Sequence, residues 1–163
     1  MKIQKILQAM IEYDRGDVYR IQHFVKVYGF AHMQGIMEGM SGKELEILDI
    51  AAILHDIGIH PAEAKYNSDA GKYQEELGPD EARRLLAPFD LEEDVVDRVC
   101  FLIGHHHTYS GVDGLDWQII LESDFLVNSF EQELSQETIR EVEKRVFKTE
   151  SGKRALEEMF ALS

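Results

Sequence analysis

The sequence is poor in cysteine, in proline and in basic residues, and it has no long apolar run. Its single cysteine, Cys100, excludes an intramolecular disulfide and is typical of a reducing compartment. Cys100 lies in the apolar run VVDRVCFLI, which favours a buried structural thiol over a nucleophile. No stretch approaches the roughly 20 apolar residues of a membrane span, and MKIQKILQAMIEY is too polar for a secretory signal. We therefore expect a cytoplasmic protein with no membrane partner.

Basic residues are outnumbered by acidic ones, 17 against 31, and the formal net charge is −14. A nucleic-acid-binding protein normally shows a basic face, and no cluster of lysine and arginine supplies one here. The charge thus argues against nucleic acid and against an anionic membrane as partners. A small anionic substrate stays compatible with it, because a bound metal ion reverses the sign of the charge locally.

Apolar residues recur at spacings of three and four, which predicts one all-helical domain over residues 1–163. We expect about seven helices, over residues 2–13, 17–39, 41–56, 90–104 and 115–132, with two more from 135 to the C-terminus. The patterns SGKE at 41–44 and DLEE at 90–93 are typical capping boxes. Residues 58–78 and 104–114 are expected to be loops that carry binding groups. The amphipathic C-terminal stretch either packs on the core, which we favour, or pairs with a second subunit in a homodimer.

Several polar residues stand where buried apolar ones are expected. His55 and Asp56 end the apolar segment LEILDIAAIL, although a buried imidazole or carboxylate costs several kcal/mol unless it finds a partner. His23 shares a helix face with apolar residues, where a lone histidine is more often a hydrogen-bonded core residue. Asp124 interrupts WQIILESDFLVN, and the alternative to a functional role is a buried ion pair with Arg20.

The run His105–His106–His107 directly follows an apolar helix, so at least one of the three rings should point inward. His32 and His60 lack such a context and are interpreted as surface or packing residues. Imidazole and carboxylate groups are ligands of Mn, Fe, Co, Ni and Zn, and the sequence has no second cysteine for a zinc–thiolate site. The inventory of candidate ligands is His23, His55, Asp56, His105, His106 and Asp124.

A set of four residues on predicted helices resembles the H…HD…D signature of the HD superfamily. In order along the chain, these residues are His23, the adjacent His55–Asp56 and Asp124. ILHDIG at 53–58 is similar to the central motif of that all-helical group of metal-dependent phosphohydrolases and their relatives. The resemblance covers about residues 18–128, the motif-bearing core, and leaves C-terminal helices at 135–162. It implies that these four residues hold one divalent transition metal, with neighbouring groups that fix the imidazole tautomers.

Some members of the superfamily bind two metals, and the HD-GYP group does so with a His-Pro pair and a later HH followed by Asp-Gly. This sequence has His105–His106 and then Asp113–Gly114. It departs from the pattern at two positions: Gly78 precedes Pro79 where the group has histidine, and Ile59 stands where the superfamily often has a lysine. The resemblance therefore implies one tight metal and leaves a weaker second one open. Candidate ligands for the second metal, or contacts for the substrate, are His105, His106, Glu75 and Glu76.

The function implied by the resemblance is hydrolysis of a small phosphate ester, nucleotide-like or another metabolite. Asp56 would orient or deprotonate a water, and His105 or His106 would contact the phosphoryl group or protonate the leaving oxygen. Candidates for holding the anionic end of the substrate are Arg20, Lys65 and Lys72. Three alternatives stay open: an HD-fold di-iron oxygenase, a non-catalytic metal-containing ligand-binding or regulatory module, and a helical domain whose buried His and Asp residues simply pair.

Overall fold

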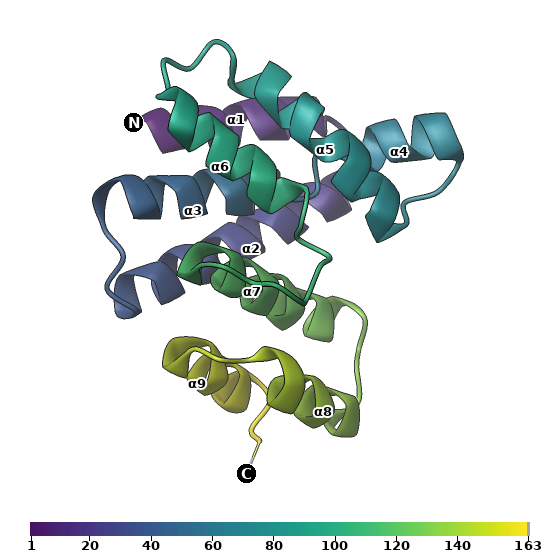
Figure 1. Cartoon of the computed structure of the whole chain (residues 1–163). Coiled ribbons are helices and arrows are strands. Elements are labelled where there is room, and N and C mark those ends of the chain that lie inside the picture. Colours follow the sequence, from purple (N-terminus) through teal and green to yellow (C-terminus); the bar gives the residue numbers. More distant parts are fainter. Residues whose placement is uncertain (163) are drawn as a thin grey trace.

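The computed structural model describes residues 1–162, and these form nine helices and no strand (Figure 1). The helices are α1 (Lys2–Tyr13), α2 (Val18–Met37), α3 (Gly42–Leu54), α4 (Ile59–Tyr66), α5 (Gly71–Leu86), α6 (Glu93–Ile103), α7 (Leu115–Glu131), α8 (Gln136–Val146) and α9 (Glu150–Met159). The all-helical prediction is confirmed, and the expected number of about seven is close. The two additional helices are α4 and α5.

Residues 58–78, predicted as a loop, are instead occupied by α4 and the first half of α5, so this prediction was wrong. The buried residues of α5 do recur every four positions, at Gln74, Gly78, Ala82 and Leu86. Two of these four are a glutamine and a glycine, so the buried stripe has no apolar signature. Hydrophobic periodicity finds a helix only where the helix buries apolar side chains.

Neither of the two predicted capping boxes forms at the start of its helix. Ser41 is the N-cap residue of α3, as expected, but its side chain makes no capping hydrogen bond. Helix α6 is preceded by Glu92 rather than by Asp90. Side-chain caps occur elsewhere, at the N-terminal ends of α2, α8 and α9, where the accepting residues are Asp17, Ser135 and Thr149.

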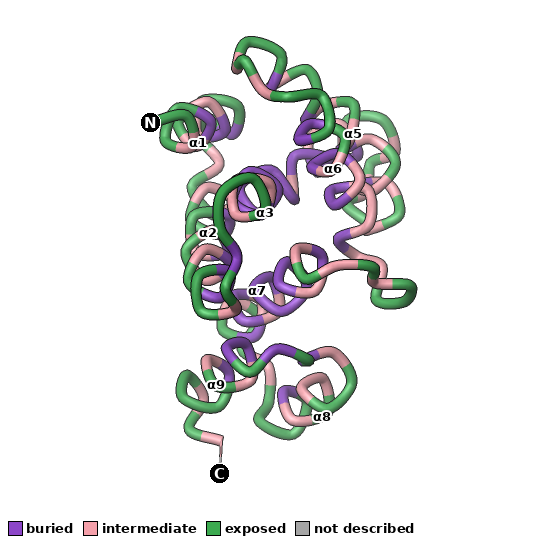
Figure 2. Tube along the Cα trace, turned by 60° about the vertical axis from the view of Figure 1, so that its left-hand side comes forward, coloured by how far each residue is buried: buried purple, intermediate pink, exposed green. Residues whose placement is uncertain are grey.

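Helix α3 lies in the middle of the bundle, where it contacts α1, α2, α6 and α7 (Figure 2). Leu48 to Leu54 is a continuous run of buried residues, which is the property expected of a helix enclosed on all sides. Cys100 on α6 is buried as well, as predicted. Because α3 ends inside the bundle, His55 and Asp56 emerge among other helices rather than at the surface. No helix within residues 1–162 is long and apolar enough to cross a membrane.

The C-terminal helices α8 and α9 lie together beyond α7 and form a second small core with it (Figure 1). The buried residues of this core are Leu126, Ile139, Phe147 and Leu156. Glu122 of α7 is fully buried and accepts hydrogen bonds from the backbone N–H groups of Lys148 (2.7 Å) and Thr149 (3.0 Å). The amphipathic C-terminal stretch therefore packs on α7, which is the alternative favoured from the sequence.

Candidate metal centre

Three helices bring the four residues of the signature together. His23 projects from the first half of α2, His55 is the residue that ends α3, Asp56 follows it, and Asp124 lies in the middle of α7. His55 is fully buried, and only about one-twentieth of His23 and of Asp124 is exposed. Helices α2, α3 and α7 lie side by side and contact one another pairwise (Figure 2). The four side chains therefore meet in the interior.

The ligand atoms converge closely. The Nε2 atom of His23 lies 3.2 Å from Nε2 of His55, 3.1 Å from Oδ1 of Asp124 and 3.3 Å from Oδ2 of Asp56. The Nε2 atom of His55 lies 3.4 Å from the same oxygen of Asp56 and 3.5 Å from that of Asp124. His23, His55 and Asp56 therefore place ligand atoms within 4.8 Å of one another, and Asp124 adjoins this group through the two histidines.

The hydrogen bonds of the Nδ1 atoms of His23 and His55 determine which tautomer each ring adopts. Nδ1 of His55 lies 2.8 Å from the carbonyl oxygen of Ala52, and Nδ1 of His23 lies 2.8 Å from a carboxylate oxygen of Glu131. Both Nδ1 atoms must donate, which leaves lone pairs on both Nε2 atoms and confirms the expected fixing of the tautomers. Two lone pairs and two carboxylates that face one another need positive charge between them, from protons on the rings or from a bound cation, and this donor set fits a divalent transition metal.

The electrostatics of the group show the same demand for positive charge at the two Nε2 atoms. Burial lowers the pKa of His55, but the carboxylates of Asp56 and Asp124 outweigh burial and raise this pKa well above its usual value. Burial raises the pKa of Asp56 and Asp124, yet the neighbouring histidines hold both values below the ordinary range. The carboxylates are therefore ionised near neutral pH, in the form that binds metal.

A second group of acceptors adjoins the first through Asp56. The Oδ1 atom of Asp56, the oxygen not directed at His23, lies 3.4 Å from Nε2 of His106. Nδ1 of His106 donates to the carbonyl oxygen of Ile103 at 2.7 Å, so Nε2 again carries a lone pair in the neutral ring. Together with His107, these residues place ligand atoms within 4.8 Å of one another.

Gln74 on α5 completes the second group. Its Nε2 donates to the carbonyl oxygen of Asp69 at 2.6 Å, which directs Oε1 toward the rings of His106 (3.2 Å) and His107 (3.0 Å). Burial and the neighbouring His106 lower the pKa of His107 to about 4, so this ring is neutral at pH 7 and can offer a lone pair. The two candidate metal groups share the Asp56 carboxylate.

The structure also explains why an imidazole is absent before Pro79. A Cβ atom added at Gly78 would lie only 2.7 Å from a side-chain carbon of Ile103. No side chain fits there while α5 packs this closely on α6. The residue of α5 that faces the histidines is Gln74, one helical turn earlier.

Among the three consecutive histidines, His106 and His107 face the site and His105 does not. Nδ1 of His105 donates to the carbonyl oxygen of Phe101 at 2.7 Å, and the ring stacks on that of Phe101 at 4.1 Å between centroids. Its backbone oxygen accepts from the indole N–H of Trp117 at 3.1 Å. His105, expected from the sequence as a catalytic or metal-binding residue, thus lies in a packing position.

The two glutamates proposed as ligands of a second metal, Glu75 and Glu76, make hydrogen bonds outside the candidate metal groups. Glu75 accepts from the backbone N–H of His107 (2.9 Å) and from the Thr108 hydroxyl (2.8 Å), so it anchors the histidine loop. Glu76 is bound on the surface by Tyr66 (2.5 Å) and Lys65 (3.2 Å). Neither glutamate belongs to the two candidate metal groups within residues 1–162.

The three basic residues proposed to hold the substrate differ in position. Arg20 lines the pocket above the metal group, and its guanidinium is bound by Asp17 and Glu63 at 2.8 Å each, not by Asp124. Lys65 is held at the surface by Glu76, and Lys72 lies over the ring of Tyr73, 4.6 Å from its centroid. The pocket lining includes Arg20 but neither lysine.

His32 and His60, interpreted as ordinary surface or packing residues, make local ion pairs. His32 contacts Asp49 at 2.9 Å, and His60 contacts Asp14 at 3.1 Å. Neither belongs to a candidate metal group among the described residues.

A pocket of about 300 Å³ opens above the first metal group. Its wall includes ligand candidates from both groups as well as polar residues at the C-terminal end of α7: His23, Asp56, Gln74, His107, Asp124, Asn128 and Glu131. His106 is fully buried and lies behind this wall. A small molecule in the pocket would therefore meet His107 rather than His106.

Glu131 was not predicted from the sequence, although it lies seven residues after Asp124 on the same face of α7. It accepts from His23 at 2.8 Å, from Lys26 at 2.6 Å and from the Tyr19 hydroxyl at 3.1 Å. Burial raises the pKa of Glu131, but its hydrogen bonds to Lys26 and His23 outweigh this and lower it. An ionised carboxylate on Nδ1 holds the ring of His23 in the orientation that a metal ligand needs.

Residues 20–148 match the family model of the HD domain, and the chain belongs to the HD domain family. The resemblance noted in the sequence is thereby confirmed. The fold is similar to that in the crystal structure of a predicted HD superfamily hydrolase from an uncultured Thermotogales bacterium, with a TM-score of 0.70 and 24% sequence identity. That likeness covers 97% of this chain and 84% of the other. The comparison with curated proteins finds no match.

Proposed function

We propose that the protein is a metal-dependent phosphohydrolase that acts on a small phosphate ester. The observation that carries this proposal is the position of Asp56, whose carboxylate faces two groups of buried acceptor atoms beneath an open polar pocket. A bound divalent metal lowers the pKa of a water ligand toward neutrality and neutralises charge that develops on phosphoryl oxygens. His23, His55, Asp56 and Asp124 would hold the first such metal.

The residues of the pocket wall suit the remaining tasks of this reaction. Asp56 is ionised, and it can orient an attacking water by accepting a hydrogen bond from it. The Arg20 guanidinium lies at the pocket wall and can donate to the anionic end of the substrate. His107, neutral at pH 7, can donate or accept a hydrogen bond at the phosphoryl group, a role that the sequence suggested for His105 or His106.

The proposed activity is tested with metal-stripped protein and a panel of phosphate monoesters. We expect no turnover without metal and recovery with Mn or Co. The Asp56→Asn variant should lose at least about 1,000-fold in turnover, since it loses both a charged metal ligand and the carboxylate that orients the water. Released phosphate is the measurement. Activity that persists in Asp56→Asn would point to a contaminating phosphatase. Binding of a substrate analogue with no product in any metal would replace the enzyme by a binding or regulatory module.

A second metal bound by Asp56, His106 and His107 is expected to be weaker than the first, because Gln74 contributes only a neutral amide. Replacing His106 by alanine should therefore lower the metal content from near two equivalents toward one, with the first metal retained. Elemental analysis at increasing metal concentration measures this change. An unchanged stoichiometry in His106→Ala would remove the second site.

The second group also supports a different reaction. A pair of adjacent metal groups that share a carboxylate is compatible with a di-iron centre, so an oxygenase of this fold is the second candidate. About two equivalents of iron in the purified protein, with substrate turnover that consumes oxygen, would favour it. Turnover with Mn or Co in the absence of oxygen would exclude it.

A further inference from the structure

A second groove, of about 870 Å³, adjoins the pocket of the metal centre. It lies between the first turns of α2, the C-terminal end of α7 and the end of α9. Its apolar lining consists of Val18, Tyr19, Phe130, Leu134 and Phe160. We call it the aromatic groove, because three of these five side chains carry rings.

The aromatic groove and the metal pocket share part of their walls. Tyr19 and Glu131 line both of them. The Tyr19 hydroxyl donates to Glu131, and the same carboxylate oxygen accepts from Nδ1 of His23. The groove therefore begins one residue away from a candidate metal ligand, and the hydrogen-bonded pair of Tyr19 and Glu131 stands between the two pockets.

The apolar side chains at this groove are unusually accessible. Val18 is 67% exposed, Tyr19 is 61% exposed and Phe130 is 66% exposed. A cluster of exposed apolar side chains in a concave surface is typical of a binding site, because it leaves apolar area in contact with water until a ligand covers it.

The charges in the groove restrict what can bind there. Among the described residues that line the aromatic groove, Lys26 is the one cation. Its ammonium lies 2.6 Å from a carboxylate oxygen of Glu131 and 5.7 Å from the ring centroid of Phe130. The remaining charged groups of the lining are the carboxylates of Glu131 and Glu133. A second phosphate would find no free cation and two negative charges, whereas an uncharged ring finds aromatic and aliphatic surface.

We propose that the aromatic groove receives the organic group of the substrate, and that this group is an uncharged, ring-bearing apolar moiety with no further phosphate. The proposal rests on the proposed function, because the phosphoryl end of the same molecule lies in the metal pocket. Phe130 and Tyr19 then determine which phosphate ester the protein prefers. Among the described residues, the side chain of Phe130 contacts Lys26 rather than a candidate metal ligand, so it is the residue to change.

The test compares phenylphosphonate with methylphosphonate as ligands of the metal-loaded protein. Both carry the same anionic group, and a phosphatase does not cleave their carbon–phosphorus bond. We expect phenylphosphonate to bind the wild type about tenfold more tightly by calorimetry, as partial burial of a ring predicts. Phe130→Ser should remove most of this ratio and leave the Kd of methylphosphonate unchanged. Because Phe130 is mostly exposed, the variant should fold normally.

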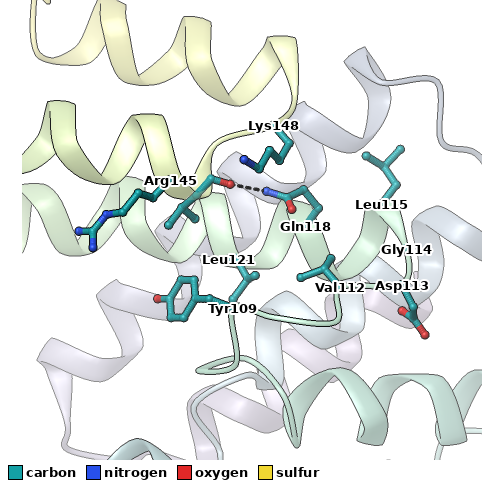
Figure 3. Close-up of a pocket in the computed structure, with 10 residues that line it drawn as sticks. Tyr109, Val112, Asp113, Gly114, Leu115, Gln118, Leu121, Arg145 and Lys148 are labelled. Carbon is teal, nitrogen blue, oxygen red and sulfur yellow. Dashed lines mark hydrogen bonds between the residues drawn. The ribbon is translucent and has the colours of Figure 1, made fainter.

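Tyr109→Ser is the matched control. Tyr109 is also an exposed aromatic residue, but it lines a different pocket of about 580 Å³ between the 105–114 segment, α7 and the end of α8, together with Leu121 and Arg145 (Figure 3). We expect Tyr109→Ser to leave the ratio of the two Kd values unchanged. A ratio that falls in Tyr109→Ser and not in Phe130→Ser would move the organic group to that other pocket and overturn the proposal.

Further outcomes separate this inference from the function on which it rests. A ratio near one in the wild type, with turnover of phosphate esters intact, would overturn the aromatic groove alone. A ratio near one accompanied by a change of sedimentation in Phe130→Ser would show that a second copy of the chain covers the groove. A tenfold ratio that Phe130→Ser removes, with no ester hydrolysed in any metal, would support the groove and overturn the phosphohydrolase.

Discussion

Replacing His55 by alanine should leave the purified protein almost without its first metal. The Nε2 atom of His55 lies within 3.5 Å of three other ligand atoms, and its ring is fully buried, so no solvent-exposed group can take its place. Loss of an outer-shell contact alone typically costs 10- to 100-fold in metal affinity, and we expect loss of a ligand to cost more than about 100-fold. The proposed phosphohydrolase activity should disappear with the metal. Elemental analysis of protein purified without added metal measures the first effect.

His105→Ala is the control for this experiment. It removes the same kind of ring from a partly buried position, but His105 packs on Phe101 and Trp117 and makes no contact with the metal groups. Its metal content should equal that of the wild type. Near-stoichiometric metal in His55→Ala, or equal losses in both variants, would contradict the assigned centre.

Replacing Gly58 by alanine should destabilise the protein by about 3 kcal/mol, the upper end of the usual cost of overpacking. A Cβ atom at this position would lie 2.5 Å from the carbonyl oxygen of Gln74 and 3.0 Å from the backbone nitrogen of Gly78. These are backbone atoms, which cannot turn aside as a flexible side chain can. For a chain of this length the melting temperature should fall by roughly 6 to 12 °C. Because α5 must move away, Gln74 should also lose its position at His106 and His107.

Gly29→Ala provides the comparison. Gly29 lies within α2, and a Cβ atom there meets nothing within 4 Å. Alanine should therefore stabilise the helix by about 0.5 to 1 kcal/mol through the lower conformational entropy of the unfolded chain. The melting temperatures of both variants, measured by thermal unfolding, test this difference. Similar melting temperatures for Gly58→Ala and Gly29→Ala would show that α4 and α5 are not held by this close approach.

The sequence was most informative where polar residues interrupt buried helices. His55 and Asp124 stand out because their neighbours on α3 and α7 are apolar, and the structure brings both to one point. Gln74 gave no such contrast, because a glutamine four residues before a glycine in a polar helix looks like an exposed surface. The buried residues of α5 share only a spacing of four positions. Without the packing of α5 on its neighbours, this spacing does not show which face of the helix is buried.

The choice among the three histidines could not be made from the sequence for another reason. Helix α6 ends at Ile103, and after Gly104 helical periodicity no longer fixes the direction of a side chain. The hydrogen bond from His106 to the carbonyl of Ile103 and the stacking of His105 on Phe101 set the orientations of these rings. Both depend on the backbone path of the loop, which local propensity does not determine.

The distance along the chain between the candidate metal ligands would link the protein to the metal supply of its cell. His23 and Asp124 are 101 residues apart, so only the folded chain brings them together. A cation present at 1,000 times its Kd lowers the unfolded population by about 1,000-fold, equivalent to about 4 kcal/mol. Unfolded chains are the ones that proteases degrade. When metal is scarce, the amount of this protein should therefore fall through faster turnover, without any change in the synthesis of the chain.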